Sequence, residues 1–418
     1  MKILDVTLTP VAFADPPLLN AMGVHEPYAL RSVMQLHCED GVVGLGESYG
    51  DAAFLDQVRT ALPGIAGHDV FDLPGLRRTV AAALGDVVVT DAHGLTGGFS
   101  SAKTLAAVYS LVEVAALDAQ GRYLGRPVVD LLGGRARERV DFSAYLFYKY
   151  GAHLDAPADD WGETTTPEQL VAQAHRMIGD YGFGSIKLKG GVFAPEREIA
   201  GIRALAEAFP GLPLRIDPNG AWTVETAIAV AAELDGVLEY LEDPTPGIPG
   251  MAAVAEQAGM PLATNMCLVR FADIEPAFRA RAVGVVLSDH HYWGGLRDTQ
   301  ALSTAAAAFD VGLSMHSNSH LGISLAAMAH VATATPHLTY ACDTHWPWRD
   351  TDVVTGDILT FRDGAITVPD TPGLGVDLDP DALARAHEDY LRCGQTSRDD
   401  AAYMRRFVAA FEPNTARW

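Results

Sequence analysis

Residues 166–189, TPEQLVAQAHRMIGDYGFGSIKLK, contain one complete unit of a helix followed by a strand. Thr166 and Gln169 form a capping-box pattern, with a proline between them at the first helical position. Apolar residues then recur at helical spacing: Leu170, Ala174, Met177 and Tyr181. The run GSIKLK follows at once, so the stretch predicts an amphipathic helix that leads into a buried strand.

The same alternation continues along the chain. Pro195 opens a second predicted helix, whose apolar face contains Ile199, Ile202, Leu205 and Phe209. Strand-like runs follow in order: PLRID (213–217), VLEYLE (237–242), PLATN (261–265), VGVVLSD (283–289), VGLSMHS (311–317) and LTYACD (338–343). Helices and strands that alternate in this way predict an α/β domain with a parallel sheet covered by helices.

Each predicted strand ends in polar or ionisable residues. Successive markers are 23 to 29 residues apart, close to one strand-and-helix unit: Lys189, Asp217, Glu242, Asn265, Asp289, His316 and His345. In a βα barrel the carboxyl ends of the strands surround one cavity. We therefore expect these dispersed side chains to form a single site.

The two ends of the chain have a different character. Residues 1–135 contain strand-like runs near the start and at VVGLGES, then a long helical stretch at 102–125, and predict a separate α+β domain. We assign the barrel to residues 136–370. Residues 371–418 are loop-rich and then helical, and periodicity alone does not place them.

Composition limits the possible partners. The 418 residues include 30 basic and 53 acidic side chains, and the net charge of -23 repels nucleic acid and anionic membrane surfaces. A small dicarboxylate can still bind if a metal and a few buried cations reverse the potential locally. No apolar window is long enough for a membrane span or a secretion signal. Four widely separated cysteines favour reduced thiols in a cytoplasm: Cys38, Cys267, Cys342 and Cys393.

Three oxygen-bearing side chains on consecutive predicted strands indicate a metal site. Asp217, Glu242 and Asn265 are the kind of ligands that Mg²⁺ prefers. The alternative is that the two carboxylates cap nearby helices, as Asp-Pro sequences commonly do. Their shared position at the strand ends favours the metal.

Two lysines share one strand face. In K-x-K the side chains of Lys187 and Lys189 point the same way, into the barrel mouth. Next to a cation and to each other, their charged forms should be disfavoured and their pKa values lowered toward that of a base. The alternative is an edge strand with two solvated lysines. The flanking GSI and GG favour a buried strand.

Asp289 and His316 lie one strand-and-helix unit apart. The carboxylate can therefore orient the imidazole and raise its basicity, although a lone His at a strand end is more often structural. A cation, a lysine pair and a His/Asp dyad together suit removal of a proton alpha to a carboxylate, with the metal stabilising the resulting anion.

At these residues the chain resembles the enolase superfamily and, within it, the glucarate dehydratase group. The motifs that carry the resemblance are SIKLKGG, RIDPNGAW, YLEDP, LATNMC, VVLSDHHYWGG, MHSNSHLGIS and DTHWPW, with DPPLLNAMGVHEPYALRS and GVVGLGESYGD nearer the start. They cover nearly the whole chain in collinear order. The resemblance implies a modified (β/α)7β TIM-like barrel, with an α+β capping domain built from the N-terminal region and the C-terminal segment. It also implies a homo-oligomer.

The resemblance also implies roles for individual residues. Mg²⁺ would be held by Asp217, Glu242 and Asn265. Lys189 would be one base, supported by Lys187, and His316 with Asp289 the other. The remaining matches concern contacts with substrate or intermediate: Asn318, Asn219, His345, Asn20, His25, Tyr145 and, on a shorter motif, Arg398.

The implied reaction is dehydration of D-glucarate, and of its epimer L-idarate, to 5-dehydro-4-deoxy-D-glucarate. Two departures from the family pattern leave alternatives open. The family has a threonine near GGFSSAKTLAAVYS, where Thr104 is a candidate, and residues 149–162 also differ. A dehydratase of another hexarate, such as galactarate, and a non-catalytic acid-sugar binder therefore stay as alternatives.

Overall fold

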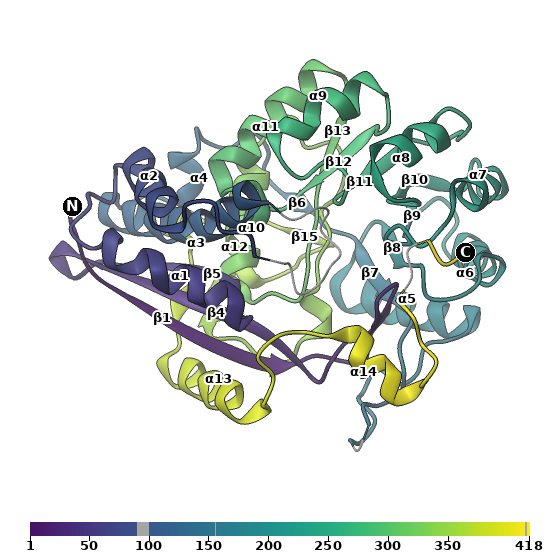
Figure 1. Ribbon diagram of the computed structural model, residues 1–418, viewed down its shortest axis with the longest axis horizontal. Coiled ribbons are helices and arrows are strands. Elements are labelled where there is room, and N and C mark those ends of the chain that lie inside the picture. Colours follow the sequence, from purple (N-terminus) through teal and green to yellow (C-terminus); the bar gives the residue numbers. More distant parts are fainter. Residues whose placement is uncertain (90–99, 155, 414–415) are drawn as a thin grey trace.

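The computed structural model describes residues 1–89, 100–154, 156–413 and 416–418. Figure 1 places the N-terminal strands and helices, in purple and blue, beside a group of teal and green strands surrounded by helices. The fold is α/β, as the alternation of elements predicted.

An antiparallel sheet of order β1-β4-β5 forms the N-terminal part. The strands and helices of this part are β1 (Ile3–Ala14), β2 (Leu19–Asn20), β3 (Gly23–Val24), β4 (Tyr28–Cys38), β5 (Val43–Tyr49), α1 (Ala52–Ile65), α2 (Leu73–Leu84), α3 (Ser101–Leu124) and α4 (Val128–Leu131), with a 3-10 turn, η1 (Glu39–Gly41). Helix α3 lies so close to β5 that a Cβ atom at Gly44 would be 2.1 Å from the carbonyl oxygen of Ala115. This close approach explains the glycines of VVGLGES.

Within the described ranges, seven parallel strands form the second sheet, and they follow one another in chain order. They are β7 (Ala144–Phe147), β8 (Ile186–Lys189), β9 (Leu214–Asp217), β10 (Leu238–Glu242), β11 (Leu262–Thr264), β12 (Val285–Ser288) and β13 (Gly312–Met315). The helices between and after them are α5 (Pro167–Tyr181), α6 (Pro195–Ala208), α7 (Val224–Glu233), α8 (Gly247–Ala255), α9 (Phe271–Arg279), α10 (His290–Trp293), α11 (Leu296–Ala308) and α12 (Gly322–Ala334).

The segment around Cys342 lies between the two ends of this sheet. On one side Cys342 bridges Phe142 in parallel, and its N–H donates to Asp141 O at 2.8 Å. On the other side Asp343 N donates to Met315 O at 2.9 Å. The segment therefore takes the place of an eighth strand, and the predicted (β/α)7β TIM-like barrel is confirmed.

The capping box predicted at the start of α5 is present. Thr166 Oγ1 accepts from Gln169 N at 3.4 Å, and Gln169 Oε1 accepts from Thr166 N at 3.0 Å. Pro167 is the first residue of the helix, and the predicted apolar face is buried at Leu170, Ala174 and Met177. Local sequence thus determines where this helix begins and which face packs on the barrel.

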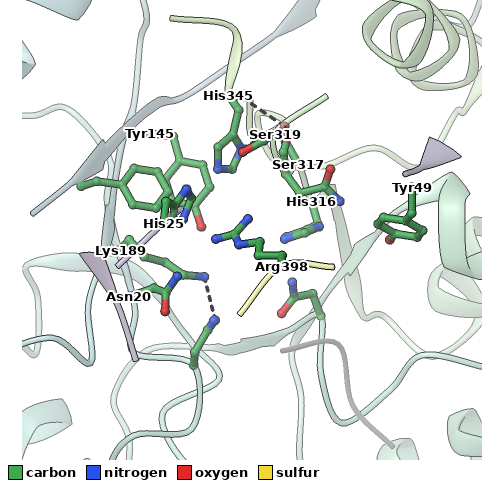
Figure 2. Close-up of a pocket in the computed structure, with 14 residues that line it drawn as sticks. Asn20, His25, Tyr49, Tyr145, Lys189, His316, Ser317, Ser319, His345 and Arg398 are labelled. Carbon is green, nitrogen blue, oxygen red and sulfur yellow. Dashed lines mark hydrogen bonds between the residues drawn. The ribbon is translucent and has the colours of Figure 1, made fainter. Parts of the chain in front are cut away.

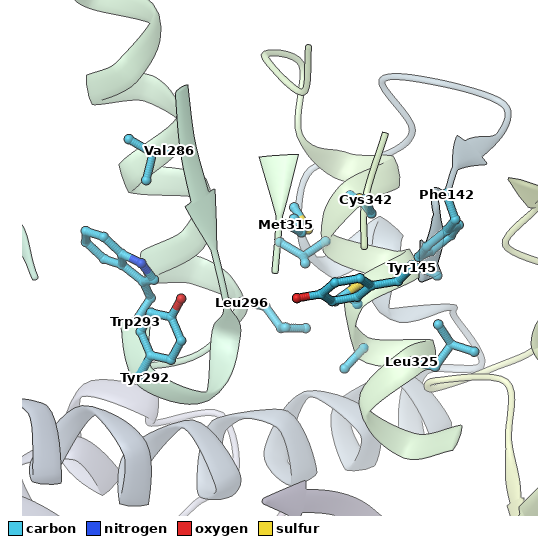
Figure 3. Close-up of a cluster of buried hydrophobic side chains, with 14 of the residues drawn as sticks. Phe142, Tyr145, Val286, Tyr292, Trp293, Leu296, Met315, Leu325 and Cys342 are labelled. Atoms are coloured by element: carbon cyan, nitrogen blue, oxygen red, sulfur yellow. The ribbon is translucent and has the colours of Figure 1, made fainter. Parts of the chain in front are cut away.

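One hydrophobic core extends through both parts of the molecule. Figure 3 shows a cluster that includes Phe142 and Cys342 at the barrel closure and Trp293 on α10. Helix α10 in turn packs against α3 of the N-terminal part. The strand ends and the capping elements are therefore held in a fixed relation.

The C-terminal segment runs back along the N-terminal part. Its elements are β16 (Asp377–Leu378), α13 (Pro380–Cys393) and α14 (Asp400–Phe407). The short elements that come earlier in the chain are β6 (Val140–Asp141), η2 (Trp346–Trp348), β14 (Val354–Thr355), η3 (Asp357–Leu359) and β15 (Ala365–Ile366). Helix α13 packs on β1 and α14 on β3. The boundaries at residues 135/136 and 370/371 stay predictions. None of the helices in the described residues combines the length and the apolar character that crossing a membrane requires.

Candidate active site

A cavity opens at the carboxyl ends of the barrel strands (Figure 2). Barrel residues form one side, and the N-terminal part and the C-terminal segment contribute the other. The lining residues are Asn20, His25, Tyr49, Tyr145, Phe147, Lys189, Asn219, Asn265, His316, Ser317, Asn318, Ser319, His345 and Arg398. All the predicted substrate contacts are among them: Asn20, His25, Tyr145, Asn219, Asn318, His345 and Arg398.

Carboxylates at the ends of β9 and β10 form the acidic cluster beside this cavity. Oxygen atoms of Asp217, Glu242 and Asp243 lie within 4.8 Å of one another, all buried. Sequence reasoning omitted Asp243, but its oxygens already accept from Thr264 Oγ1 at 2.5 Å and from Asn265 N at 2.8 Å. Asp243 therefore orients Asn265, whose buried Oδ1 accepts no hydrogen bond from any residue that the structure describes. An unpartnered oxygen directly after β11, the strand next to the one that carries Glu242, fits the predicted ligand set of Asp217, Glu242 and Asn265.

The two carboxylates in this ligand set titrate differently. Burial acts to raise the pKa of Asp217, but Lys189 and Lys187 hold it below its ordinary value. Burial and the neighbouring charge of Asp217 raise the pKa of Glu242 well above its ordinary value. Two neighbouring carboxylates resist being ionised at the same time, because their negative charges repel each other. A bound divalent cation would offset that repulsion.

The two lysines of K-x-K face into the barrel, as predicted, and β8 lies between β7 and β9. The alternative of a solvated edge strand is therefore wrong. Lys189 lines the cavity, and its Nζ donates to Asp217 Oδ2 and Asn219 Oδ1, both at 2.7 Å. Lys187 lies deeper.

The predicted fall in lysine pKa does not hold for Lys187. Its Nζ donates to Glu242 Oε1 at 2.8 Å and to Asp343 Oδ2 at 2.7 Å. Burial by itself lowers its pKa, but Asp343 and Glu242 raise the pKa well above its ordinary value. Glu242, which the sequence analysis assigned only as a metal ligand, and Asp343, to which it gave no role, thus keep this lysine charged.

The predicted His/Asp pair is formed. His316 Nδ1 lies 3.1 Å from Asp289 Oδ2, while Asp289 Oδ1 lies 2.6 Å from His291 Nδ1. Burial acts to raise the pKa of Asp289, but its two histidine partners lower the pKa well below its ordinary value. In Figure 2, Lys189 and His316 enter the cavity from different sides, with the Arg398 side chain between them. Two candidate bases therefore face one space.

The capping side carries polar side chains that are each held by a carboxylate. Arg398 donates through Nε and Nη2 to the two oxygens of Asp400, at 2.6 and 2.7 Å. Asn20 Nδ2 donates to the same carboxylate at 2.7 Å, and His25 Nδ1 lies 3.0 Å from Asp15 Oδ2. A buried guanidinium and an oriented imidazole are groups that recognise a carboxylate.

Two family models match the chain. The model for the mandelate racemase / muconate lactonizing enzyme N-terminal domain covers residues 3–133, and the model described as enolase C-terminal domain-like covers residues 169–382. The chain belongs to the enolase superfamily.

Several members of the superfamily are similar over their whole length. A protein from Streptomyces coelicolor described as a probable glucarate dehydratase is 52% identical, over 100% of this chain and 99% of that protein. An enolase from Thermobispora bispora, crystallised with magnesium and formate, is 57% identical, covers 100% of both chains and has a TM-score of 0.99. An enolase from Pseudomonas fluorescens with magnesium, potassium and tartrate is 50% identical over 100% of this chain and 99% of that chain, with a TM-score of 0.96.

These comparisons confirm the family resemblance that the motifs predicted, and they support an enzyme. The presence of magnesium in close structural neighbours agrees with the acidic cluster found here. The roles of individual residues in this enolase-superfamily chain stay predictions, although the structure brings the predicted residues together.

Sequence reasoning missed four lining residues: Tyr49, Phe147, Ser317 and Ser319. Phe147 could have been found, because it lies two residues after Tyr145 on the same strand face. Thr104, the candidate for the family's threonine, is not part of the lining, since its hydroxyl donates to Ser100 O and accepts from Val89 N. Residues 90–99, which include the start of GGFSSAKTLAAVYS, lie outside the described residues.

Proposed function

We propose that the protein is a magnesium-dependent acid-sugar dehydratase that acts on D-glucarate and L-idarate and forms 5-dehydro-4-deoxy-D-glucarate. The observation that carries the proposal is that Lys189 and His316 face one cavity from different strands. Asn265 lines the same cavity, and Asp217 and Glu242 belong to the buried carboxylate cluster. Similarity to a probable glucarate dehydratase over the full length supports the choice of hexarate.

Asp217, Glu242 and Asn265 are the proposed magnesium ligands. Magnesium, when bound there, supplies positive charge that favours loss of the proton next to a carboxylate. The unpartnered Asn265 oxygen and the opposed pKa shifts of the two carboxylates support this assignment.

His316 is the proposed base for D-glucarate. Its Nε2 takes the proton from C5, and Asp289 stabilises the imidazolium that forms. The same proton then passes to the hydroxyl on C4, which leaves as water while a C4–C5 double bond forms. The resulting enol becomes the ketone. Lys189 removes the C5 proton of the opposite epimer, L-idarate, from the other side.

Arg398, His25 and Asn20 are proposed to hold the distal carboxylate. Their carboxylate partners fix the positions of these side chains before substrate arrives, which lowers the entropy cost of binding. Tartrate, found in the Pseudomonas fluorescens structure, is itself a hydroxylated dicarboxylate. This supports a substrate with an acid at each end.

The first test is turnover with a panel of acid sugars. Purified protein with Mg²⁺ is incubated with D-glucarate, L-idarate, galactarate and tartrate, and release of a 2-keto-3-deoxy product is measured. We expect product from glucarate and idarate alone. Turnover of galactarate instead would assign a different hexarate as the substrate. Binding of hexarates without any turnover would contradict the proposed dehydratase activity.

The second test separates the two bases. In D₂O, His316→Asn should abolish dehydration of D-glucarate, whereas Lys189→Ala should retain proton exchange from the opposite side of the substrate. Each variant serves as the control for the other. Complete and equal loss of exchange with both epimers in each variant would contradict the assignment of two bases.

A further inference from the structure

Asp289 is shared between two histidines, and the nearer one does not line the cavity. Its Oδ2 faces His316 Nδ1 at 3.1 Å. Its Oδ1 accepts from the backbone N–H of His291 at 2.9 Å and lies 2.6 Å from His291 Nδ1. His291, which sequence reasoning passed over in SDHHYW, is buried at the start of α10. The shorter of the two side-chain contacts thus belongs to a residue with no assigned role.

The far nitrogen of His291 contacts a side chain that can only donate. His291 Nε2 lies 2.9 Å from Arg31 Nη2 and 2.9 Å from Ser324 Oγ. A guanidinium has no acceptor atom, so its hydrogen bond requires an unprotonated Nε2. The single ring proton of His291 must then be on Nδ1, where it points at Asp289.

Arg31 is itself held firmly. Its Nε donates to Glu47 Oε1 at 2.8 Å, and both side chains are buried. Glu47 also accepts from Leu321 N at 2.8 Å and Ser324 N at 2.9 Å, at the start of α12. Strands β4 and β5 of the N-terminal part are thereby connected to the barrel beside Asp289.

We propose that His291 and Arg31 are positioning residues that set the proton arrangement of the His316 base. Arg31 keeps His291 neutral and protonated on Nδ1. His291 donates that proton in a hydrogen bond to one oxygen of Asp289, which leaves the other oxygen for His316 Nδ1–H. His316 Nε2 then presents its lone pair to the cavity. The inference rests on the proposed role of His316 as a base.

The neutrality of His291 is what makes this arrangement useful. A charged His291 would compensate the negative charge of Asp289 and weaken its support of the imidazolium at His316. A neutral donor orients the carboxylate and leaves its charge available. The oxygens of Asp289 and both nitrogens of His291 are engaged in this way.

The first test reads the protons directly and needs no substrate. In protein with ¹⁵N-labelled histidine, two-dimensional NMR at neutral pH should show one protonated and one unprotonated nitrogen for His291 and for His316, with Nδ1 protonated in each. Signals are assigned by their loss in His291→Phe and His316→Asn. A doubly protonated His291, or one protonated on Nε2, would overturn the proposal.

The second test removes the donor and restores it. His291→Phe keeps a ring but no donor, and kcat should fall about 10- to 100-fold while KM changes less than about threefold. The His316 signals should also lose their single Nδ1-protonated form. His291→Gln, whose amide can donate to the same oxygen, should recover most of the loss.

His290→Phe is the matched control, because the buried Nε2 of His290 has no hydrogen-bond partner among the described residues. It should leave both readouts unchanged. Wild-type kcat and an unchanged His316 signal in a folded His291→Phe variant would overturn the proposal. If the wild type turns over no hexarate, the proposed function fails, but the NMR result still decides the proton arrangement.

Discussion

The barrel side and the capping side of the cavity are built on different principles. On the barrel side, charged residues lie at the ends of parallel strands, and lysines and carboxylates contact one another directly: Lys187, Lys189, Asp217, Glu242 and Asp343. On the capping side, Arg398 and His25 each have a carboxylate partner of their own, Asp400 and Asp15. In the first arrangement several charges share one space, and in the second each side chain is fixed by its own partner.

This difference matches the two tasks that we propose. Proton transfer requires groups whose protonation can change, so charges that compete for one space are an advantage. Recognition of a distal carboxylate requires donors that stay charged and still.

The largest expected effect follows from changing the barrel side at Glu242. Glu242→Gln removes a negative charge from the proposed metal site and from Lys187, so turnover should fall about 1000-fold or more. Magnesium affinity, measured by calorimetric titration, should fall as well. Glu239→Gln on the same strand is the control, because Glu239 bonds Arg215 away from the cavity. Loss of less than about tenfold in Glu242→Gln would argue against a metal held by this carboxylate.

A smaller effect, and a different kinetic signature, is expected on the capping side. Arg398→Gln should lower kcat/KM about 100-fold, mostly through KM, because the proposed distal contact is lost and Asp400 is left buried without its cation. Arg405→Gln is the matched control, since Arg405 belongs to α14 but its ion pair with Glu412 is exposed. A fall confined to kcat would remove the distinction between the two sides.

Sequence predicted the barrel well because each strand carries its own evidence. The runs that end at Lys189, Asp217 and Glu242 became β8, β9 and β10 without a shift. The run LTYACD was harder to predict, since Thr339 N and Tyr340 N both donate to Leu313 O and the regular ladder is interrupted. The pairing of β14 with β16 joins two short segments that are separated in the sequence, and no local sequence pattern predicts it.

The residues of the candidate site also fall into those that the strand pattern predicted and those that it did not. Strand register alone brought the barrel residues together, because the carboxyl ends of parallel strands meet. Asn20, His25 and Arg398 came only from the family resemblance, since their positions depend on contacts between residues hundreds apart, such as Asn20 with Asp400. The high pKa of Lys187 was missed for a related reason, because it depends on how Asp343 and Glu242 pack around its ammonium group.

The smallest expected effect concerns the pH at which the ion pair between Arg398 and Asp400 is lost. Burial acts to raise the pKa of Asp400, but Arg398 lowers it to about 2. A carboxyl whose pKa is lower in the folded state stabilises the fold above its unfolded value and loses that contribution as pH falls. The difference in unfolding free energy between wild type and Asp400→Asn should therefore shrink by about 2 kcal/mol on acidification, with about half lost by about pH 3. Urea denaturation at several pH values measures it. A constant difference from pH 5 to pH 3 would mean that Arg398 does not hold Asp400 ionised, and the capping side would then lack the fixed charge that distinguishes it from the barrel side.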